Sequence, residues 1–173
     1  MTGLESYIRD IPDFPKQGIV FKDITPLLGD AGAFGDAIAR MASLVPRPDA
    51  VVGIESRGFL FGAPLALRWG VPFVPARKFG KLPGKTVRQV YSLEYGEDAL
   101  ELHTDGLRPG WKTVIVDDLL ATGGTALATV ELVRQLKAEP VAALFVVELL
   151  GLGGRAKLAP LPVHSLMATE VKE

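Results

Sequence analysis

Two adjacent carboxylates and a short glycine–threonine run are the residues whose types and spacing point most directly to chemistry. Asp117 and Asp118 follow residues 113–116, an unbroken apolar run that predicts a strand buried on both faces. The run Thr-Gly-Gly-Thr at 122–125 comes four residues later. Glycines at this position let backbone N–H groups approach an anion at the start of a helix. We therefore expect carboxylates and an anion cradle side by side.

The ligand of such a site must satisfy both halves. The lysine of a nucleoside-triphosphate P-loop is missing here, so that class of site is excluded. Carboxylates repel phosphate but accept hydrogen bonds from hydroxyls. A ligand with a phosphate at one end and a diol nearby fits, and ribose 5-phosphate is such a ligand. The alternative is an acidic turn with a glycine helix cap, which a lone Gly-Gly pair would favour.

The elements around these residues predict an alternating strand–helix chain. After the glycines, apolar residues recur at helical spacing until Pro140, so we expect 117–125 to form a strand-to-helix loop. Open α/β sheets bind ligands at this end of their strands. Further expected strands cover 50–54, 71–76, 100–103, 141–149 and an edge strand at 163–167, and expected helices cover 4–9, a segment from Asp30, and a segment ending at Trp69. Residues 14–26 are expected to be an irregular arm, and the glycine cluster at 151–154 lacks dinucleotide-binding spacing.

A second strand end also carries polar residues. Residues 50–54 lead into Glu55, Ser56 and Arg57, followed by an apolar helix. An arginine there can meet a phosphate or diphosphate. It can equally form an ion pair with Glu55 or another acid, and spacing alone does not decide between these two roles.

A basic segment follows the third expected strand. Residues 77–88 contain five cations and no acid, with Gly80, Pro83 and Gly84 as breaks. Such charge runs are usually solvated faces. Because this one leads into the stretch Tyr-Ser-Leu-Glu-Tyr-Gly at 91–96, we interpret it as a long hairpin or lid that can bind anions.

Composition bounds the remaining possibilities. The chain has 173 residues, is 48% hydrophobic and has a net charge of -1, which suits one compact domain and gives no support to nucleic-acid binding. It contains no cysteine, and its two histidines, His103 and His164, lack metal-ligand spacing. No apolar run has membrane-spanning length and no signal-peptide pattern opens the chain, so we expect a soluble, cytoplasmic protein without membrane partners.

The stretch at 113–125 resembles the phosphoribosyl-diphosphate (PRPP) signature of the type I phosphoribosyltransferases: apolar residues, two acids and a Thr-Gly-Gly-Thr turn. Further matches resemble the adenine-specific branch of this family, and they lie at Phe14-Pro15, 18–23, 55–62, 77–84, 91–96 and 147–149. The resemblance implies an α/β fold with a mostly parallel central sheet flanked by helices. It also implies one domain over 1–173, with a hood over 1–30 and a flexible lid hairpin over 77–98.

The resemblance implies a transfer of 5-phosphoribose from PRPP to adenine, giving AMP and diphosphate. Asp117 and Asp118 would hold the ribose hydroxyls and offset positive charge on the sugar in an oxocarbenium-like state. The 5-phosphate would bind Ala121, Thr122, Gly123, Gly124 and Thr125. The diphosphate would meet Ser56, Arg57, Arg77, Lys78, Lys81 and Tyr95. Mg²⁺ would be chelated by PRPP, with no direct ligand from the protein.

For the base, the resemblance implies recognition of the adenine edge by backbone groups of Val20 and Lys22, with apolar contact from Phe21 and Leu149. Lys22 replaces the arginine often found in the family. Glu94 would manage the proton as N9 attacks, as the catalytic acid/base. The family also forms homodimers in which the residue matching Arg77 reaches towards the partner's site.

Two other functions remain open at the level of sequence. The same transfer could go to a 6-oxopurine, although no lysine is clearly placed to donate to O6. A PRPP-sensing regulator without catalysis would usually need an additional DNA-binding or partner-binding module, and 173 residues leave no spare length for one.

Overall fold

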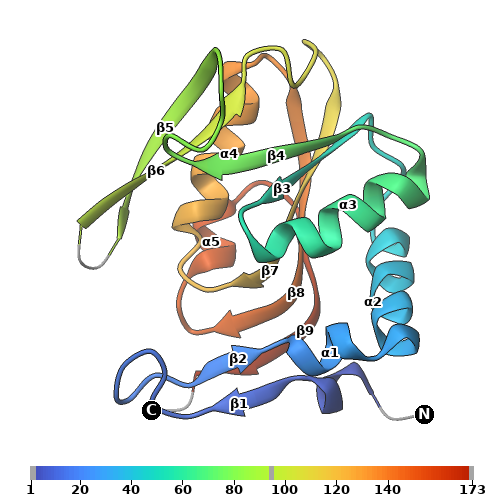
Figure 1. Ribbon diagram of the computed structural model, residues 1–173, viewed down its shortest axis with the longest axis vertical. Coiled ribbons are helices and arrows are strands. Elements are labelled where there is room, and N and C mark those ends of the chain that lie inside the picture. Colours follow the sequence, from blue (N-terminus) through green and yellow to red (C-terminus); the bar gives the residue numbers. More distant parts are fainter. Residues whose placement is uncertain (1–2, 94–95, 172–173) are drawn as a thin grey trace.

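A seven-stranded sheet forms the centre of the protein, and helices cover both of its faces (Figure 1). The structure is a computed structural model that describes residues 3–93 and 96–171. The strands of the sheet are β3 (Ala50–Ile54), β4 (Phe73–Lys78), β5 (Thr86–Leu93), β6 (Gly96–His103), β7 (Lys112–Leu120), β8 (Glu139–Leu150) and β9 (Val163–Glu170). The helices are α1 (Thr25–Gly29), α2 (Ala31–Ser43), α3 (Arg57–Trp69), α4 (Gly124–Gln135) and α5 (Gly154–Leu158).

The order of strands in this sheet is β5-β6-β4-β3-β7-β8-β9. From β4 to β9 all neighbours are parallel, whereas β5 and β6 form an antiparallel hairpin that joins the sheet beside β4. The chain therefore builds outward from β3 to β4 on one side and continues with β7 on the other. Such a reversal of strand order is where open α/β sheets bind their ligands.

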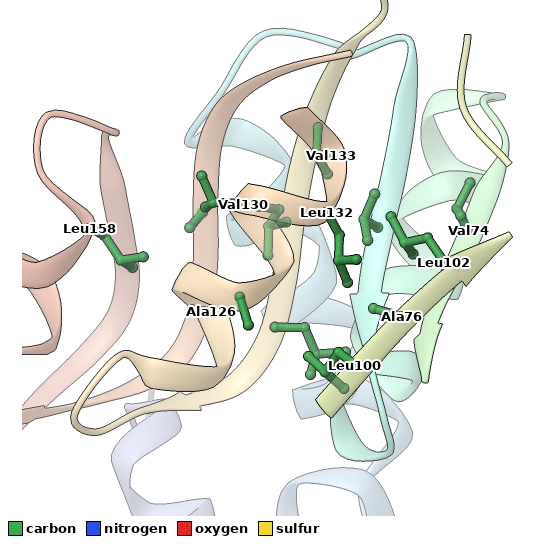
Figure 2. Packing of buried hydrophobic residues seen from close by; sticks show 14 of the residues in the cluster. Val74, Ala76, Leu100, Leu102, Ala126, Val130, Leu132, Val133 and Leu158 are labelled. Carbon is green, nitrogen blue, oxygen red and sulfur yellow. The ribbon is translucent and has the colours of Figure 1, made fainter. Parts of the chain in front are cut away.

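Two separate hydrophobic cores hold the helices to the sheet. On one face, α4 packs over β5, β6, β7 and β8 with α5 beside it, and Figure 2 shows Leu132 of α4 on the side of Leu100 and Leu102 of β6. On the other face, α1, α2 and α3 pack over the same sheet. Alternate residues of β3 enter the two cores, which explains why this strand is apolar at every position.

A two-stranded antiparallel ladder lies apart from the main sheet, near the ends of β8 and β9 (Figure 1). It consists of β1 (Arg9–Ile11) and β2 (Phe21–Asp23), preceded by a short 3-10 helix, η1 (Leu4–Tyr7). Leu4, Ile24 and Leu27 of this N-terminal region are buried in the core shared with α2 and α3. The sequence stretches expected to be hood and lid thus correspond to β1–β2 and to the β5–β6 hairpin, and their functional roles stay predictions.

The fold class expected from the sequence is confirmed, and four local predictions need correction. The strand at 50–54 and the helices starting near Asp30 and ending at Trp69 are found as expected. The expected helix at 4–9 is only a 3-10 turn, the arm at 14–26 contains β2 and α1, and the strand expected at 71–76 begins at Phe73. The fourth correction concerns the expected loop at 117–125.

Most of that expected loop is regular structure. Strand β7 continues through both aspartates to Leu120, and α4 begins at Gly124. The strand extends because its ladder with β8 continues past the apolar run, pairing Leu119 with Val147 and Leu120 with Glu148. The two acids interrupt the apolar pattern without interrupting the ladder, so hydrophobicity alone placed the strand end too early.

Candidate active site

The predicted carboxylates lie at the strand-order reversal. Asp117 and Asp118 are near the carboxyl end of β7, and Ser56 and Arg57 follow β3, which pairs with β7 in parallel. Gly58 lets α3 approach this point, because a Cβ atom there would lie 2.6 Å from the carbonyl oxygen of Val116. The missing side chain thus brings the start of α3 against the aspartate pair.

The two aspartates differ in their surroundings. Asp118 is 3% exposed, and its Oδ2 has no hydrogen-bond partner among the described residues. The Nε of Arg57 lies 3.0 Å from this oxygen, an ion-pair distance without hydrogen-bond geometry. The backbone N–H of Asp118 donates to Oδ1 of Asp117 at 2.8 Å. A buried acceptor without a donor is the kind of group that a ligand hydroxyl can satisfy.

The pair also has unusual electrostatics. Burial raises the pKa of the Asp117 carboxyl well above its ordinary value, and the neighbouring charge of Asp118 raises it further. Arg57 opposes this rise only in part. The aspartate pair therefore holds a proton more readily than two independent carboxylates, and hydroxyl donors or a nearby positive charge would favour its full ionisation.

The glycine–threonine run forms a small hollow beside the aspartates. The hollow has a volume of about 100 Å³ and is lined by Asp117 and residues 119–126, together with Phe145. Gly123 has a left-handed backbone with φ of 79° and immediately precedes α4, so the chain turns sharply into the helix. Backbone N–H groups at the start of α4 have no partner within the helix and give the hollow its capacity for an anion.

A larger cleft adjoins this hollow and shares Asp117 and Thr125 with it. Its volume is about 270 Å³, and its lining is Glu55, Ser56, Arg57, Lys78, Tyr91, Asp98, Leu100, Asp117, Asp118 and Thr125. The structure thus brings together side chains from β4, β5, β6 and β7, from the starts of α3 and α4 and from the two residues after β3, which lie as far as seventy residues apart in sequence (55 to 125). Three predicted diphosphate residues, Ser56, Arg57 and Lys78, are among them.

Arg77 and Lys81 are placed differently from Lys78. Arg77 donates to both carboxylate oxygens of Glu55, at 3.2 and 3.3 Å, and to the carbonyl oxygen of Lys81. Burial tends to raise the pKa of Glu55, but the hydrogen bonds from Arg77 and from the backbone N–H of Lys78 outweigh it and lower the pKa. Glu55 is thus occupied by Arg77, and Arg57 is paired with Asp118.

Sequence reasoning missed three residues of the cleft, Tyr91, Asp98 and Leu100. The Tyr91 hydroxyl donates to Asp98 at 3.2 Å, and Lys78 Nζ lies 3.5 Å from the same carboxylate. Their positions follow from the β5–β6 register, in which Tyr91 pairs with Asp98. That pairing could have been sought by treating 86–103 as one antiparallel hairpin.

The predicted base residues lie on two sides of β2. The ring of Phe21 packs edge-on against Phe14, and the guanidinium of Arg57 lies 4.9 Å from the Phe21 ring centre. Because Arg57 also contacts Asp118, this arginine connects the Phe21 ring to the aspartate pair.

Val20, Lys22 and Leu149 instead line a mainly apolar hollow of about 290 Å³ with residues 18–19, 152 and 170–171. The ammonium of Lys22 is bound by Asp10 at 2.7 Å, across the β1–β2 ladder. Its side chain is therefore engaged within the hood.

Two predicted residues, Glu94 and Tyr95, lie outside the described residues. In the part of the chain that is described, no three or more His, Asp or Glu side chains gather in an arrangement suited to a metal ion. Within the same residues, no helix combines the length and apolar character needed to cross a lipid bilayer.

Comparison with known proteins identifies the family of this chain. Residues 28–157 match the family model described as "Phosphoribosyl transferase domain". The adenine phosphoribosyltransferase of Carboxydothermus hydrogenoformans is 56% identical over 166 residues, covering 95% of this chain and 98% of that protein. The crystal structure of the enzyme of that name from Thermoanaerobacter pseudethanolicus has a TM-score of 0.93 at 52% identity, covering 96% of this chain and 98% of the other.

A third likeness comes from a structure with ligands. The adenine phosphoribosyltransferase of Saccharomyces cerevisiae, solved in complex with an imino-altritol bisphosphate and adenine, has a TM-score of 0.89 at 44% identity and covers 94% of this chain and 96% of that one. The chain therefore belongs to the phosphoribosyltransferase family, and within it to the adenine phosphoribosyltransferases.

Proposed function

We propose that this protein transfers the 5-phosphoribosyl group of PRPP to N9 of adenine, giving AMP and diphosphate. The observation that carries the proposal is the pair of adjoining hollows that share Asp117 and Thr125. One is small, rich in backbone N–H groups and suited to a single phosphate. The other is larger, bounded by Arg57 and Lys78, and suited to a diphosphate. The identity with enzymes of this activity supports the same conclusion.

In this arrangement PRPP lies across the shared wall. Its 5-phosphate accepts hydrogen bonds from residues 121–125, and its ribose hydroxyls donate to Asp117 and Asp118. The Oδ2 atom of Asp118 supports this assignment, because it has no hydrogen-bond donor among the described residues and a ligand hydroxyl could donate to it. Hydroxyl donors also favour ionisation of Asp117, and the aspartate pair then faces the positive charge that develops on the sugar.

The diphosphate leaves from the anomeric carbon towards Ser56, Arg57 and Lys78, which line the larger cleft. Mg²⁺ bound by PRPP would neutralise part of the diphosphate charge. The ammonium of Lys78 is paired with Asp98, so it must leave this carboxylate to bind a diphosphate oxygen directly. Arg77 and Lys81 add positive charge at the mouth of the same region, with Arg77 held by Glu55.

The base must stand where N9 can reach the anomeric carbon. Phe21 is the predicted base residue nearest the aspartates through its contact with Arg57, so we assign it the ring contact. The exocyclic amine and N1 of adenine would meet backbone acceptor and donor groups of Val20 and Lys22. The ion pair of Lys22 with Asp10 supports recognition through main chain, because it occupies the ammonium elsewhere. Leu149 adds apolar surface beside the hood.

The proton on N9 must leave as the new C–N bond forms and the bond to diphosphate breaks. On the family resemblance we assign its removal to Glu94, and a contact with the diphosphate to Tyr95. The hairpin over 77–98 would act as a lid, which excludes water that competes with adenine for the sugar. On the family resemblance we further propose a hood over 1–30, a single domain over 1–173, a homodimer and action in the cytoplasm.

A panel of acceptor bases tests this function. The protein is incubated with PRPP and Mg²⁺ and with adenine, hypoxanthine or guanine, and diphosphate release is followed. We expect release with adenine and kcat/KM for the 6-oxopurines lower by about 10²-fold or more, because a backbone donor–acceptor pair that fits adenine leaves polar groups unpaired with hypoxanthine. Faster release with a 6-oxopurine would overturn the base assignment. No release with any base would indicate a PRPP-binding regulator.

A further inference from the structure

The segment that follows β8 returns to the phosphate hollow and touches it without a side chain in between. A Cβ atom on Gly154, the first residue of α5, would collide with the carbonyl oxygen of Ala121 and lie 2.9 Å from Leu120 Cδ1. A Cβ atom on Gly123 would in turn lie 2.9 Å from the carbonyl oxygen of Gly154. Backbone therefore packs directly on backbone, and only glycine permits this approach.

The next residue, Arg155, anchors this contact to the sheet. Its guanidinium donates to both carboxylate oxygens of Glu148 in β8, with the Nε bond at 2.9 Å. It also donates to the carbonyl oxygen of Val163, at the start of β9, at 2.6 Å. Ser165 donates to Glu148 at 3.0 Å. The two-pronged geometry fixes the direction of the arginine as well as its distance.

The ion pair between Glu148 and Arg155 is strong because Glu148 is buried. Its side chain is 6% exposed, whereas that of Arg155 is 52% exposed. Hydrogen bonds from Arg155 lower the pKa of Glu148 although burial opposes them. A buried carboxylate is strongly destabilised if its cationic partner moves away, so Arg155 is held in one position.

The strand register connects this anchor back to the phosphate hollow. Leu120, the last residue of β7 before the phosphate hollow, pairs with Glu148 in β8. The path runs from Leu120 across the ladder to Glu148, through the ion pair to Arg155, and through Gly154 back to Ala121 and Gly123. Segments more than thirty residues apart in sequence (120 to 154) are thereby fixed against each other.

We propose that Glu148, Gly154 and Arg155 are positioning residues for the 5-phosphate: they hold the backbone of 121–124 in the shape that binds the phosphoryl group, without touching it themselves. This inference rests on the proposed function for the identity of the ligand. Preorganised donors cost less to bring into place when the ligand binds, so a loosened backbone weakens phosphate binding selectively.

The test compares two ligands that occupy opposite ends of the site. Dissociation constants are measured calorimetrically for ribose 5-phosphate and for diphosphate with Mg²⁺, in the wild type and in the variants Gly154→Ala, Arg155→Met and Arg155→Lys. We expect the dissociation constant for ribose 5-phosphate to rise about tenfold in Gly154→Ala and Arg155→Met, as displaced supporting groups typically cause. The dissociation constant for diphosphate should stay within about twofold of the wild-type value. Arg155→Lys keeps the positive charge but cannot donate to both carboxylate oxygens in the planar geometry of a guanidinium. Its dissociation constant for ribose 5-phosphate should therefore lie between those of the wild type and Arg155→Met.

Two matched variants serve as controls. Gly35→Ala replaces a helical glycine with no neighbour within 4 Å of the added atom. Arg134→Met removes an arginine of similar exposure, 51%, whose ion pair with Glu131 lies on the surface of α4. Both should bind ribose 5-phosphate as the wild type does.

The outcomes separate this inference from the proposed function. Equal weakening of both ligands would indicate a general structural role and overturn the inference, as would unchanged binding of ribose 5-phosphate in the Arg155 variants. If Gly154→Ala does not fold, the Arg155 variants decide, because their replaced guanidinium is half exposed. A wild type that binds ribose 5-phosphate but transfers the 5-phosphoribosyl group of PRPP to no base would refute the proposed function and leave the positioning comparison valid.

Discussion

At the scale of single residues, the chemistry depends on a balance of charges within a few ångströms. Asp118 is buried beside Arg57, and Asp117 is adjacent to both. Burial raises the pKa of Asp117, and repulsion from the neighbouring carboxylate of Asp118 raises it further. The same repulsion is useful once a sugar with developing positive charge stands in front of the pair.

This electrostatic cost predicts how stability depends on pH. An acid whose pKa is higher in the folded than in the unfolded protein binds more protons when folded, so stability falls as pH rises between the two values. Relative to the variant Asp117→Asn, the wild type should therefore lose unfolding free energy as pH rises above about 4, the ordinary aspartate value. Denaturant unfolding of both proteins between about pH 4 and 8 measures the difference. A wild type that gains stability relative to Asp117→Asn over this range would contradict the raised pKa.

The proposed role of Glu94 gives a kinetic prediction. Glu94→Gln keeps the size of the side chain and removes its basicity, so kcat should fall by about 10²-fold or more while PRPP binding changes little. Steady-state kinetics together with PRPP binding to the variant measures both. Unchanged kcat would remove Glu94 from the reaction.

At the scale of elements, the site is the meeting point of two strand ends, one hairpin and one helix start. Strand β7 delivers the aspartates, the start of α4 forms the phosphate hollow, and β3 leads into Arg57. Gly58 and Gly154 let α3 and α5 approach the end of β7 from the two faces of the sheet. Each approach depends on an absent side chain.

The hood adds a prediction about base recognition. If backbone groups of β2 read the adenine edge and the ammonium of Lys22 only pairs with Asp10, then Lys22→Arg should leave the KM for adenine within about twofold, because an arginine can keep the ion pair. Initial rates at saturating PRPP measure this. A tenfold change in KM for adenine would show that the side chain at this position takes part in recognition.

Local patterns in the sequence identified most elements, and their failures have physical causes. The apolar run at 50–54 predicted β3 correctly because a strand buried on both faces is apolar throughout. The end of β7 was placed too early because a ladder bond carries no hydrophobic signal at Asp117. The extra strand β2 was missed because its three residues are only half-buried and do not alternate clearly.

At the scale of the whole molecule, two cores on opposite faces hold one rigid sheet whose reversal of strand order defines the cleft (Figure 1). Sequence motifs named Ser56, Arg57, Lys78, Asp117, Asp118 and Thr125, and the fold brings these together. The sequence did not identify Tyr91, Asp98 or the Glu148–Arg155 pair, because these residues come together only through strand register and packing. Pairings of this kind depend on the sheet as a whole.

The most direct measurement of the central claim is a crystal structure of the protein with AMP. We predict the 5-phosphate in the hollow formed by 121–125, the ribose hydroxyls on Asp117 and Asp118, and the adenine ring against Phe21. A nucleotide bound elsewhere, or one whose phosphate occupies the larger cleft beside Lys78 while its ribose leaves the aspartates unpaired, would contradict it.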